Sequence, residues 1–138
     1  MRAVLDVNVL VSALLSRGGT PAQIVSSWLT GEFELVVSEA LIAELERALE
    51  YPKVRTRIPA EDAAAYVELL REGAVAAADP PMPPRRSPDP GDDYLLALAE
   101  AQKAVLVTGD QHLLELVARF PIRTPRAFLE GLQGPSAE

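Results

Sequence analysis

The chain of 138 residues contains no cysteine and only one histidine, His112. Without cysteine it can form no disulfide, no thiolate zinc site and no iron–sulfur cluster, and it has no cysteine nucleophile. A single histidine argues against a multi-histidine zinc site and against a histidine-based catalytic triad. The absence of cysteine also fits a reducing compartment, so we expect a cytoplasmic protein.

Basic residues are in deficit, since 13 Lys and Arg face 20 Asp and Glu and leave a net charge of −7. This balance argues against a protein that holds nucleic acid by bulk electrostatics. It does not exclude a nuclease, because bound divalent ions offset clustered carboxylates locally. Long hydrophobic runs are also missing. The first apolar segment is interrupted by Asp6 and Asn8, so we expect no membrane span.

Hydrophobic residues make up 49% of the chain and charged residues 24%, which is ordinary for a globular protein. We expect one domain over residues 1–132 and a frayed tail over 133–138. Apolar runs predict strands in the first sixteen residues and at 33–37, 74–78, 104–107 and 122–124. Caps and periodicity predict helices at 20–30, 39–50, 59–72, 94–102, 110–119 and 125–132. The alternation predicts an α/β fold: a three-layer α/β/α sandwich around a short, mostly parallel sheet of about four or five strands.

Asp6 is the residue that the fold alone explains least well. It interrupts a run of Val and Leu and falls near the carboxyl end of the first predicted strand, where open α/β sheets bind their ligands. An ionised carboxylate in such a place needs a cation or several hydrogen bonds, because its burial is otherwise strongly unfavourable. We therefore interpret Asp6 as a functional residue.

Three further acidic positions are expected at the same edge of the sheet. Asp110 ends the strand 104–107, and Asp92, with Asp93 beside it, lies in the first turn of a buried helix. Glu44 lies on the helix that follows the second strand. In a parallel sheet the strand ends and the first turns of the following helices share one edge, so these carboxylates can meet at one cleft.

Each of these positions also has a purely structural interpretation. Asp110 is suited to cap its helix, and Asp92 is suited to pair with Asp89 in a capping box. Glu44 lies at one edge of the apolar stripe of its helix and Glu46 at the other, so periodicity does not choose between them. The residues alone leave these alternatives open.

Carboxylates without histidine or thiolate select hard cations such as Mg²⁺ or Mn²⁺. Such ions activate water and stabilise the leaving oxygen in phosphodiester hydrolysis, either singly or as a pair. The acidic positions together therefore predict a metal-dependent phosphodiesterase. His112 is expected on a helix surface rather than among the ligands.

Four segments, 4–13, 37–45, 89–99 and 104–114, occur in an order and spacing that match a known family. They are Val-Leu-Asp-Val-Asn-Val-Leu-Val-Ser-Ala, Val-Ser-Glu-Ala-Leu-Ile-Ala-Glu-Leu, Asp-Pro-Gly-Asp-Asp-Tyr-Leu-Leu-Ala-Leu-Ala and Ala-Val-Leu-Val-Thr-Gly-Asp-Gln-His-Leu-Leu. On these segments the chain resembles the PIN-domain ribonucleases, in particular the VapC-like toxins of bacterial and archaeal toxin–antitoxin pairs. The resemblance extends from Val4 to about Phe128.

The resemblance implies a metal-dependent endoribonuclease that uses Mg²⁺ or Mn²⁺, is inhibited by a small antitoxin protein and forms a homodimer. It implies a catalytic and metal-binding quartet of Asp6, Glu44, Asp92 and Asp110, with Asp93 as the alternative to Asp92. It selects Glu44 over Glu46. Asn8 and Thr108 would orient the quartet, and Ser12 would be a minor neighbour.

Contacts with RNA are only weakly indicated. Basic residues in predicted turns are available to grip phosphates, although solvated surface charge explains them equally well: Arg17, Lys53, Arg55, Arg57, Arg85 and Arg86. No stripe of aromatic and basic residues indicates base stacking. The alternative functions are a PIN-fold binding module without activity and a Mg²⁺-dependent phosphoacceptor domain. The latter needs a lysine after a late strand, whereas Lys103 precedes one.

Overall fold

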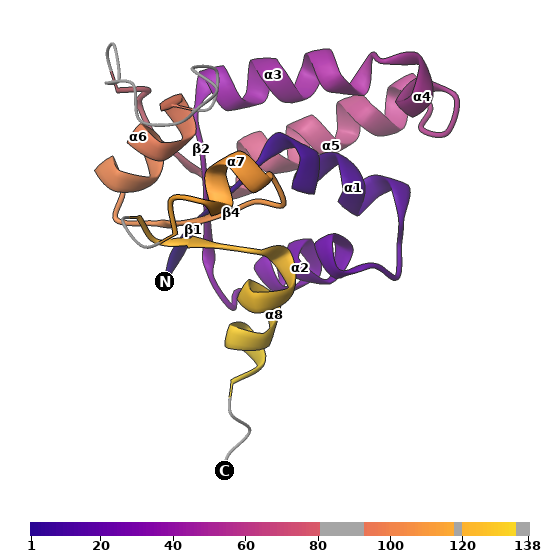
Figure 1. Ribbon diagram of the computed structural model, residues 1–138. Helices are drawn as coiled ribbons and strands as arrows, with labels where there is room; N and C mark the ends of the chain where they lie inside the picture. The colour runs from indigo at the N-terminus through magenta and orange to yellow at the C-terminus, as the bar shows by residue number, and fades with distance from the viewer. Residues whose placement is uncertain (81–92, 118–119, 135–138) are drawn as a thin grey trace.

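The computed structural model describes residues 1–80, 93–117 and 120–134 (Figure 1). The strands of this part of the chain form one five-stranded sheet, in which every neighbouring pair is parallel. They are β1 (Arg2–Leu5), β2 (Glu34–Val37), β3 (Val75–Ala76), β4 (Val105–Val107) and β5 (Ile122–Arg123). The helices are α1 (Val7–Leu15), α2 (Thr20–Leu29), α3 (Glu39–Leu49), α4 (Pro52–Arg55), α5 (Ala60–Gly73), α6 (Asp93–Ala101), α7 (Gln111–Leu114) and α8 (Pro125–Gln133). The predicted α/β sandwich is confirmed.

The strand order is β3-β2-β1-β4-β5, with β1 at the centre of the sheet. From β1 the chain winds outward through β2 and β3 on one side, and β4 and β5 extend the other side. The winding therefore reverses between β1 and β4, where Leu5 lies opposite Val107. Crevices at such a reversal, outside the carboxyl ends of the strands, are where open α/β sheets bind ligands.

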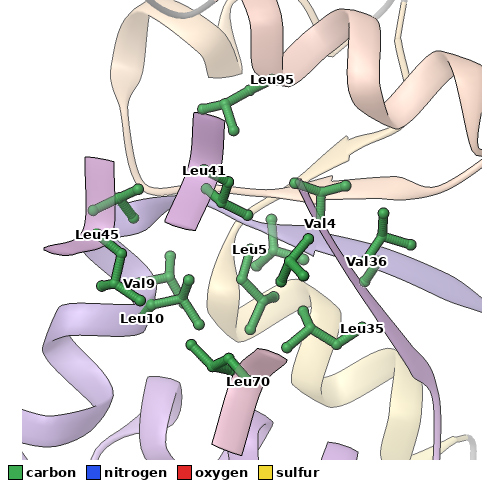
Figure 2. Packing of buried hydrophobic residues seen from close by; sticks show 14 of the residues in the cluster. Val4, Leu5, Val9, Leu10, Leu35, Val36, Leu41, Leu45, Leu70 and Leu95 are labelled. Atoms are coloured by element: carbon green, nitrogen blue, oxygen red, sulfur yellow. The ribbon is translucent and has the colours of Figure 1, made fainter. Parts of the chain in front are cut away.

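The core fills the space between the central strands and the helices that pack on them. Figure 2 shows Leu5 of β1 among Leu10 of α1, Leu41 and Leu45 of α3, and Leu70 of α5. All five of these side chains are fully buried. Each such burial stabilises the fold by about 1.5–3 kcal/mol, so α3 is held firmly in the core, where it packs against α1 and α5. No helix of the described residues combines the length and the apolar character that crossing a membrane requires.

The first predicted strand was wrong in its extent. β1 ends at Leu5, and the apolar residues that follow belong to α1, which begins at Val7. Asp6 makes this change possible, because its side chain accepts a hydrogen bond from the backbone N–H of Asn8 and caps the helix. Burial of Val9 and Val11 against the core then outweighs the low helix propensity of β-branched residues.

The helix predicted at 110–119 is also shorter than expected. The structure describes α7 as a single turn, Gln111–Leu114, and residues 118–119 lie outside the described part of the chain. Asp89, to which a capping role was assigned, and Arg85 and Arg86, which were candidates for phosphate contacts, lie outside it too.

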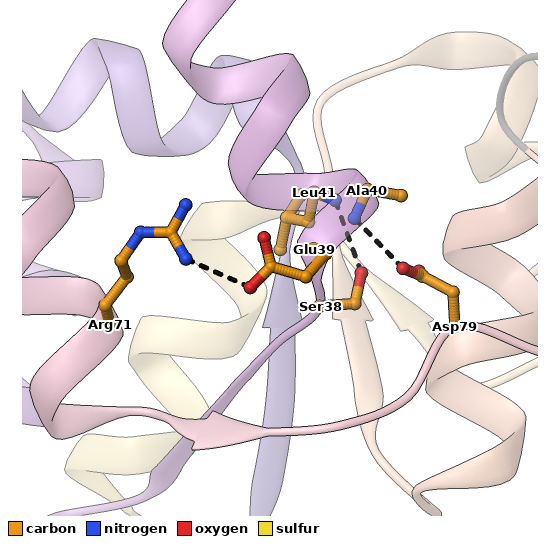
Figure 3. A network of polar contacts seen from close by, with 6 residues as sticks. All are labelled: Ser38, Glu39, Ala40, Leu41, Arg71 and Asp79. Atoms are coloured by element: carbon orange, nitrogen blue, oxygen red, sulfur yellow. Dashed lines mark hydrogen bonds and ion pairs between the residues drawn. The ribbon is translucent and has the colours of Figure 1, made fainter.

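The beginning of α3 is fixed by three polar contacts (Figure 3). Ser38 Oγ accepts from Leu41 N at 3.3 Å, and Asp79 Oδ2 accepts from Ala40 N at 3.0 Å. Two of the N–H groups that a helix start leaves unsatisfied are thereby paired, each such cap contributing about 0.5–2 kcal/mol. Arg71 Nη1 of α5 also lies 3.0 Å from Glu39 Oε2. These contacts set the position of the helix that carries Glu44.

Candidate active site

Asp6 lies directly after β1, at the reversal between β1 and β4. Its backbone N–H donates to Val107 O at 3.0 Å, which continues the pairing of the two strands by one residue. The residue is only 7% exposed. Its Oδ1 accepts from Asn8 N at 3.3 Å, and its Oδ2 accepts from Thr108 Oγ1 at 2.7 Å. One carboxylate oxygen is therefore held by the first turn of α1, and the other by the residue that follows β4.

Thr108 connects Asp6 with Asp110. The threonine is fully buried, and while it donates to Asp6 its Oγ1 accepts from Asp110 N at 3.0 Å. Asp110 in turn caps α7, because its Oδ1 accepts from His112 N at 2.8 Å. The structural role that the sequence left open for Asp110 is real, and it places this carboxylate beside the end of β4. His112 is 60% exposed on its side chain, with Nδ1 3.6 Å from Asp110 Oδ1.

Glu44 enters the site from α3 and is held by a tyrosine. Glu44 is half-buried and accepts a hydrogen bond from the Tyr94 hydroxyl of α6 through its Oε1. Glu46, two positions further on, is exposed and lines a groove between α3 and α5 instead. The structure therefore directs Glu44, and not Glu46, toward the central strands.

The electrostatics place these groups in one neighbourhood. Burial raises the pKa of Asp6 above its usual value of 3.8, and the nearby charges of Glu44 and Asp110 raise it further. The hydrogen bonds from Thr108 and Asn8 act in the opposite direction, but they do not outweigh the burial. These carboxylates bring together negative charge that a cation would relieve.

Tyr94 is also affected by the charges of Glu44 and Asp6. Its pKa is raised well above the usual range by burial, by its hydrogen bond to Glu44 and by the charges of Glu44, Asp6 and Asp79. Tyr94 was not among the predicted site residues, because the helix 94–102 is apolar nearly all round. The sequence feature that could have indicated Tyr94 is its position directly after the acidic pair Asp92 and Asp93, at the start of a buried helix.

Of the other predicted site residues, the structure describes Asp93, Asn8 and Ser12 but not Asp92. Asp92 lies outside the described residues, whereas Asp93 begins α6 and is buried. The choice between them stays open. Asn8 and Ser12 follow one another by one turn on α1, Asn8 exposed and Ser12 half-buried. Lys103 precedes β4 and so lies at the opposite end of that strand from Thr108, which disfavours the phosphoacceptor alternative.

The donor chemistry of the site fits a hard divalent cation, because it offers carboxylate oxygens without nitrogen or sulfur ligands. Asp6 is buried at a raised pKa beside two further acids, which is the electrostatic situation that such an ion resolves. Over residues 1–80, 93–117 and 120–134, however, no three acidic or histidine side chains form a ready-made metal cage. The arrangement is an acidic neighbourhood whose fourth predicted member, Asp92, is not described.

Comparisons with known proteins agree with this geometry. A family model described as PIN domain matches residues 2–112. An uncharacterized protein of Methanocaldococcus jannaschii, MJ1680, is 22% identical over 140 residues, which cover 94% of this chain and 90% of that protein.

Two solved structures share the fold. One is PAE2754 from Pyrobaculum aerophilum, at a TM-score of 0.65 and 18% identity, covering 96% of this chain and 89% of that one. The other is VapBC-1 from nontypeable Haemophilus influenzae, at a TM-score of 0.61 and 19% identity, covering 91% and 99%.

Proposed function

This chain belongs to the PIN-domain family, and from that premise we propose that it is a Mg²⁺- or Mn²⁺-dependent endoribonuclease and the toxin of a toxin–antitoxin pair. The observation that carries the proposal is the setting of Asp6. Its carboxylate is buried at the reversal of the sheet, with Glu44 and Asp110 close enough to raise its pKa. A buried carboxylate beside like charges is a candidate for a functional residue, because both its burial and its neighbours disfavour the ionised form.

The proposed ligands of the ion are Asp6, Glu44 and Asp110, together with Asp92 or its alternative Asp93. When bound, Mg²⁺ or Mn²⁺ supplies Lewis acidity toward water and toward the leaving oxygen of a phosphodiester. The chain's own contribution is to hold the carboxylates in place. Thr108 orients Asp6, the start of α7 orients Asp110, and Tyr94 orients Glu44. Contacts of this kind around a metal site fix the direction of its ligands.

The proposed partners are an RNA substrate, a small antitoxin and a second copy of the chain, in the cytoplasm. The fold shared with VapBC-1 supports the antitoxin. We propose that an antitoxin helix or extended tail lies over the acidic site and directs an arginine toward its carboxylates. A PIN fold that only binds its partner is the alternative, and the presence of Asp6, Glu44 and Asp110 together argues against it.

The test is metal-dependent cleavage of RNA by the purified full chain. We expect no cleavage in chelator, restored cleavage on addition of Mn²⁺ or Mg²⁺, and loss of that restored activity in Asp6→Asn. Circular dichroism of the variant controls for folding. Equal cleavage by Asp6→Asn and the unmodified chain would remove the mechanism proposed here.

The third ligand is decided by two neighbouring variants in the same assay. Asp92→Asn is expected to lose cleavage, while Asp93→Asn, at a buried position of α6, is expected to retain cleavage but to unfold at a lower temperature. The reverse pattern of activities would assign the ligand to Asp93. Full activity in both would mean that neither is a ligand.

A further inference from the structure

A cavity of about 440 Å³ lies between α1, α3 and α4. Asn8 is one of its lining residues, and the backbone N–H of the same residue donates to Asp6 Oδ1. Asn8 therefore links the cavity with one carboxylate of the candidate active site. The size of the cavity falls within the range of small-molecule binding sites.

The walls of this cavity are apolar and one of them is aromatic. Val11 and Leu15 of α1 and Val54 of α4 line it, and Tyr51, just before α4, stands at its edge. Tyr51 is 62% exposed, which is unusual for a large aromatic side chain that has apolar neighbours. Aromatic faces beside apolar surface are the platforms on which unpaired bases stack.

A cation lies at the same edge. Lys53 of α4 lines the cavity and is exposed, although the chain as a whole carries a net charge of −7. Residues 52–58 contain three basic side chains and no acidic one. Arg57 Nη2 also donates to Leu15 O at 2.8 Å, which ties the segment after α4 to the end of α1. The segment that carries Lys53 is thus basic, and a hydrogen bond fixes it to the end of α1.

On the basis of the proposed nuclease function, we propose that this cavity binds the base of an RNA nucleotide next to the scissile phosphate. Tyr51 stacks on that base, and Lys53 pairs with its phosphate. An acidic active site repels a polyanion, so a substrate strand needs a cation beside it, and the cavity offers one within reach of an aromatic platform. Tyr51 and Lys53 are close in the sequence, but the α1 wall of the cavity is about 40 positions away from them, so the sequence alone did not indicate the site.

A cation facing a different way supplies the control. Arg55 lies two positions after Lys53 on the same short helix and is equally exposed, but it lines the groove between α3 and α5 with Glu46. Lys53→Gln and Arg55→Gln therefore remove the same charge from opposite sides of α4. For the tyrosine, Tyr51→Phe retains the ring and Tyr51→Ala removes it.

The experiment measures binding of a fluorescent single-stranded RNA octamer to the full chain by anisotropy, in chelator and over a series of salt concentrations. Tyr51→Ala is expected to weaken binding roughly tenfold at every salt concentration, and Tyr51→Phe to bind like the unmodified chain. Lys53→Gln is expected to reduce the slope of log K against log salt by about 0.7, the value for one phosphate of a single strand. Arg55→Gln should leave the slope nearly unchanged.

The outcomes separate this inference from the nuclease proposal. If RNA binding depends on Tyr51 but the chain cleaves no RNA, the result would support base binding in the cavity and overturn the proposed nuclease activity. If Tyr51→Ala changes neither RNA cleavage nor RNA binding, the proposed base-binding role of the cavity would be wrong, while the proposed nuclease activity would be unaffected. If Tyr51→Ala leaves RNA binding unchanged but weakens self-association of the full chain in size-exclusion chromatography, the cavity is a protein-docking site and the inference is wrong. Equal effects of Lys53→Gln and Arg55→Gln would also overturn the role given to Lys53.

Discussion

Glu44 and Glu46 lie two positions apart on α3, yet they face different surroundings. Glu44 is half-buried, accepts a hydrogen bond from Tyr94 and lies close enough to Asp6 to raise the pKa of that residue. Glu46 is exposed and lines the groove between α3 and α5, where Arg55 and Arg71 also lie. Glu44 adds to a group of acidic side chains, and Glu46 lies among mixed charges in contact with solvent.

This comparison shows that the role of an acid depends on its neighbours. On the Glu44 side, burial and like charges accumulate unfavourable electrostatics that a divalent ion can relieve. On the Glu46 side, solvent screens the carboxylate, and exposed charges of this kind contribute little to stability. The two sides of α3 therefore respond differently to the same substitution.

The largest effect is expected from the glutamates themselves. Glu44→Gln should reduce metal-dependent RNA cleavage by about 100-fold or more, because ligand losses exceed the roughly 10–100-fold losses seen for residues that only support a ligand. Glu46→Gln should remain within about twofold of the unmodified chain, as expected for a surface position. Steady-state cleavage rates under matched metal concentrations measure both. Equal losses in the two variants would show that the orientation of α3 does not separate their roles.

A smaller effect is expected from the tyrosine that holds Glu44. Tyr94→Phe should lower cleavage by about 10-fold and weaken the apparent affinity for Mn²⁺, since Glu44 loses the contact that orients it. Tyr66→Phe is the matched control: its hydroxyl donates to Leu10 O at 2.9 Å, away from the carboxylates. It should cost about 1 kcal/mol of stability and leave the cleavage rate unchanged. Tyr94 would be a packing residue only, if its phenylalanine variant kept the metal affinity of the unmodified chain.

The smallest effect, a few degrees in melting temperature, is expected from Asp6→Asn in chelator. Because the folded-state pKa of Asp6 lies above its usual value of 3.8, its ionised form costs stability. This cost grows as the pH rises from about that value through the folded-state pKa, and it is fully present above it. At pH 7 the variant should therefore melt at an equal or higher temperature than the unmodified chain, although asparagine cannot accept both of the present hydrogen bonds. A drop of several degrees would assign Asp6 a mainly structural role.

The same variant should also lose the stabilisation that a bound ion confers. Adding Mn²⁺ at about 100 times its dissociation constant stabilises a folded protein by about 2.7 kcal/mol. We expect the melting temperature of the unmodified chain to rise by several degrees and that of Asp6→Asn to stay constant. Thermal unfolding with and without Mn²⁺ measures the difference, and identical shifts in both proteins would mean that Asp6 does not bind the ion.

Much of the fold follows from local patterns. The strands at 33–37, 104–107 and 122–124 and the helices that begin near Thr20, Glu39 and Pro125 lie close to where turn residues and periodicity predict them. The first sixteen residues did not follow this rule. A run of Val and Leu fits a buried strand and a buried helix equally well, and in the structure the change from strand to helix coincides with the cap that Asp6 forms with Asn8 N.

By itself, the sequence determined that acids follow buried strands and that no histidine or thiolate competes with them, and these two facts predict an oxygen-ligand site at one edge of a parallel sheet. The family resemblance already favoured Glu44 over Glu46, but only the tertiary structure showed that Tyr94 holds Glu44 and that Tyr51 and Lys53 line a cavity together with Asn8. The physical reason is that periodicity specifies which stripe of a helix is apolar. Which rim of that stripe meets a given strand depends on how separate elements pack.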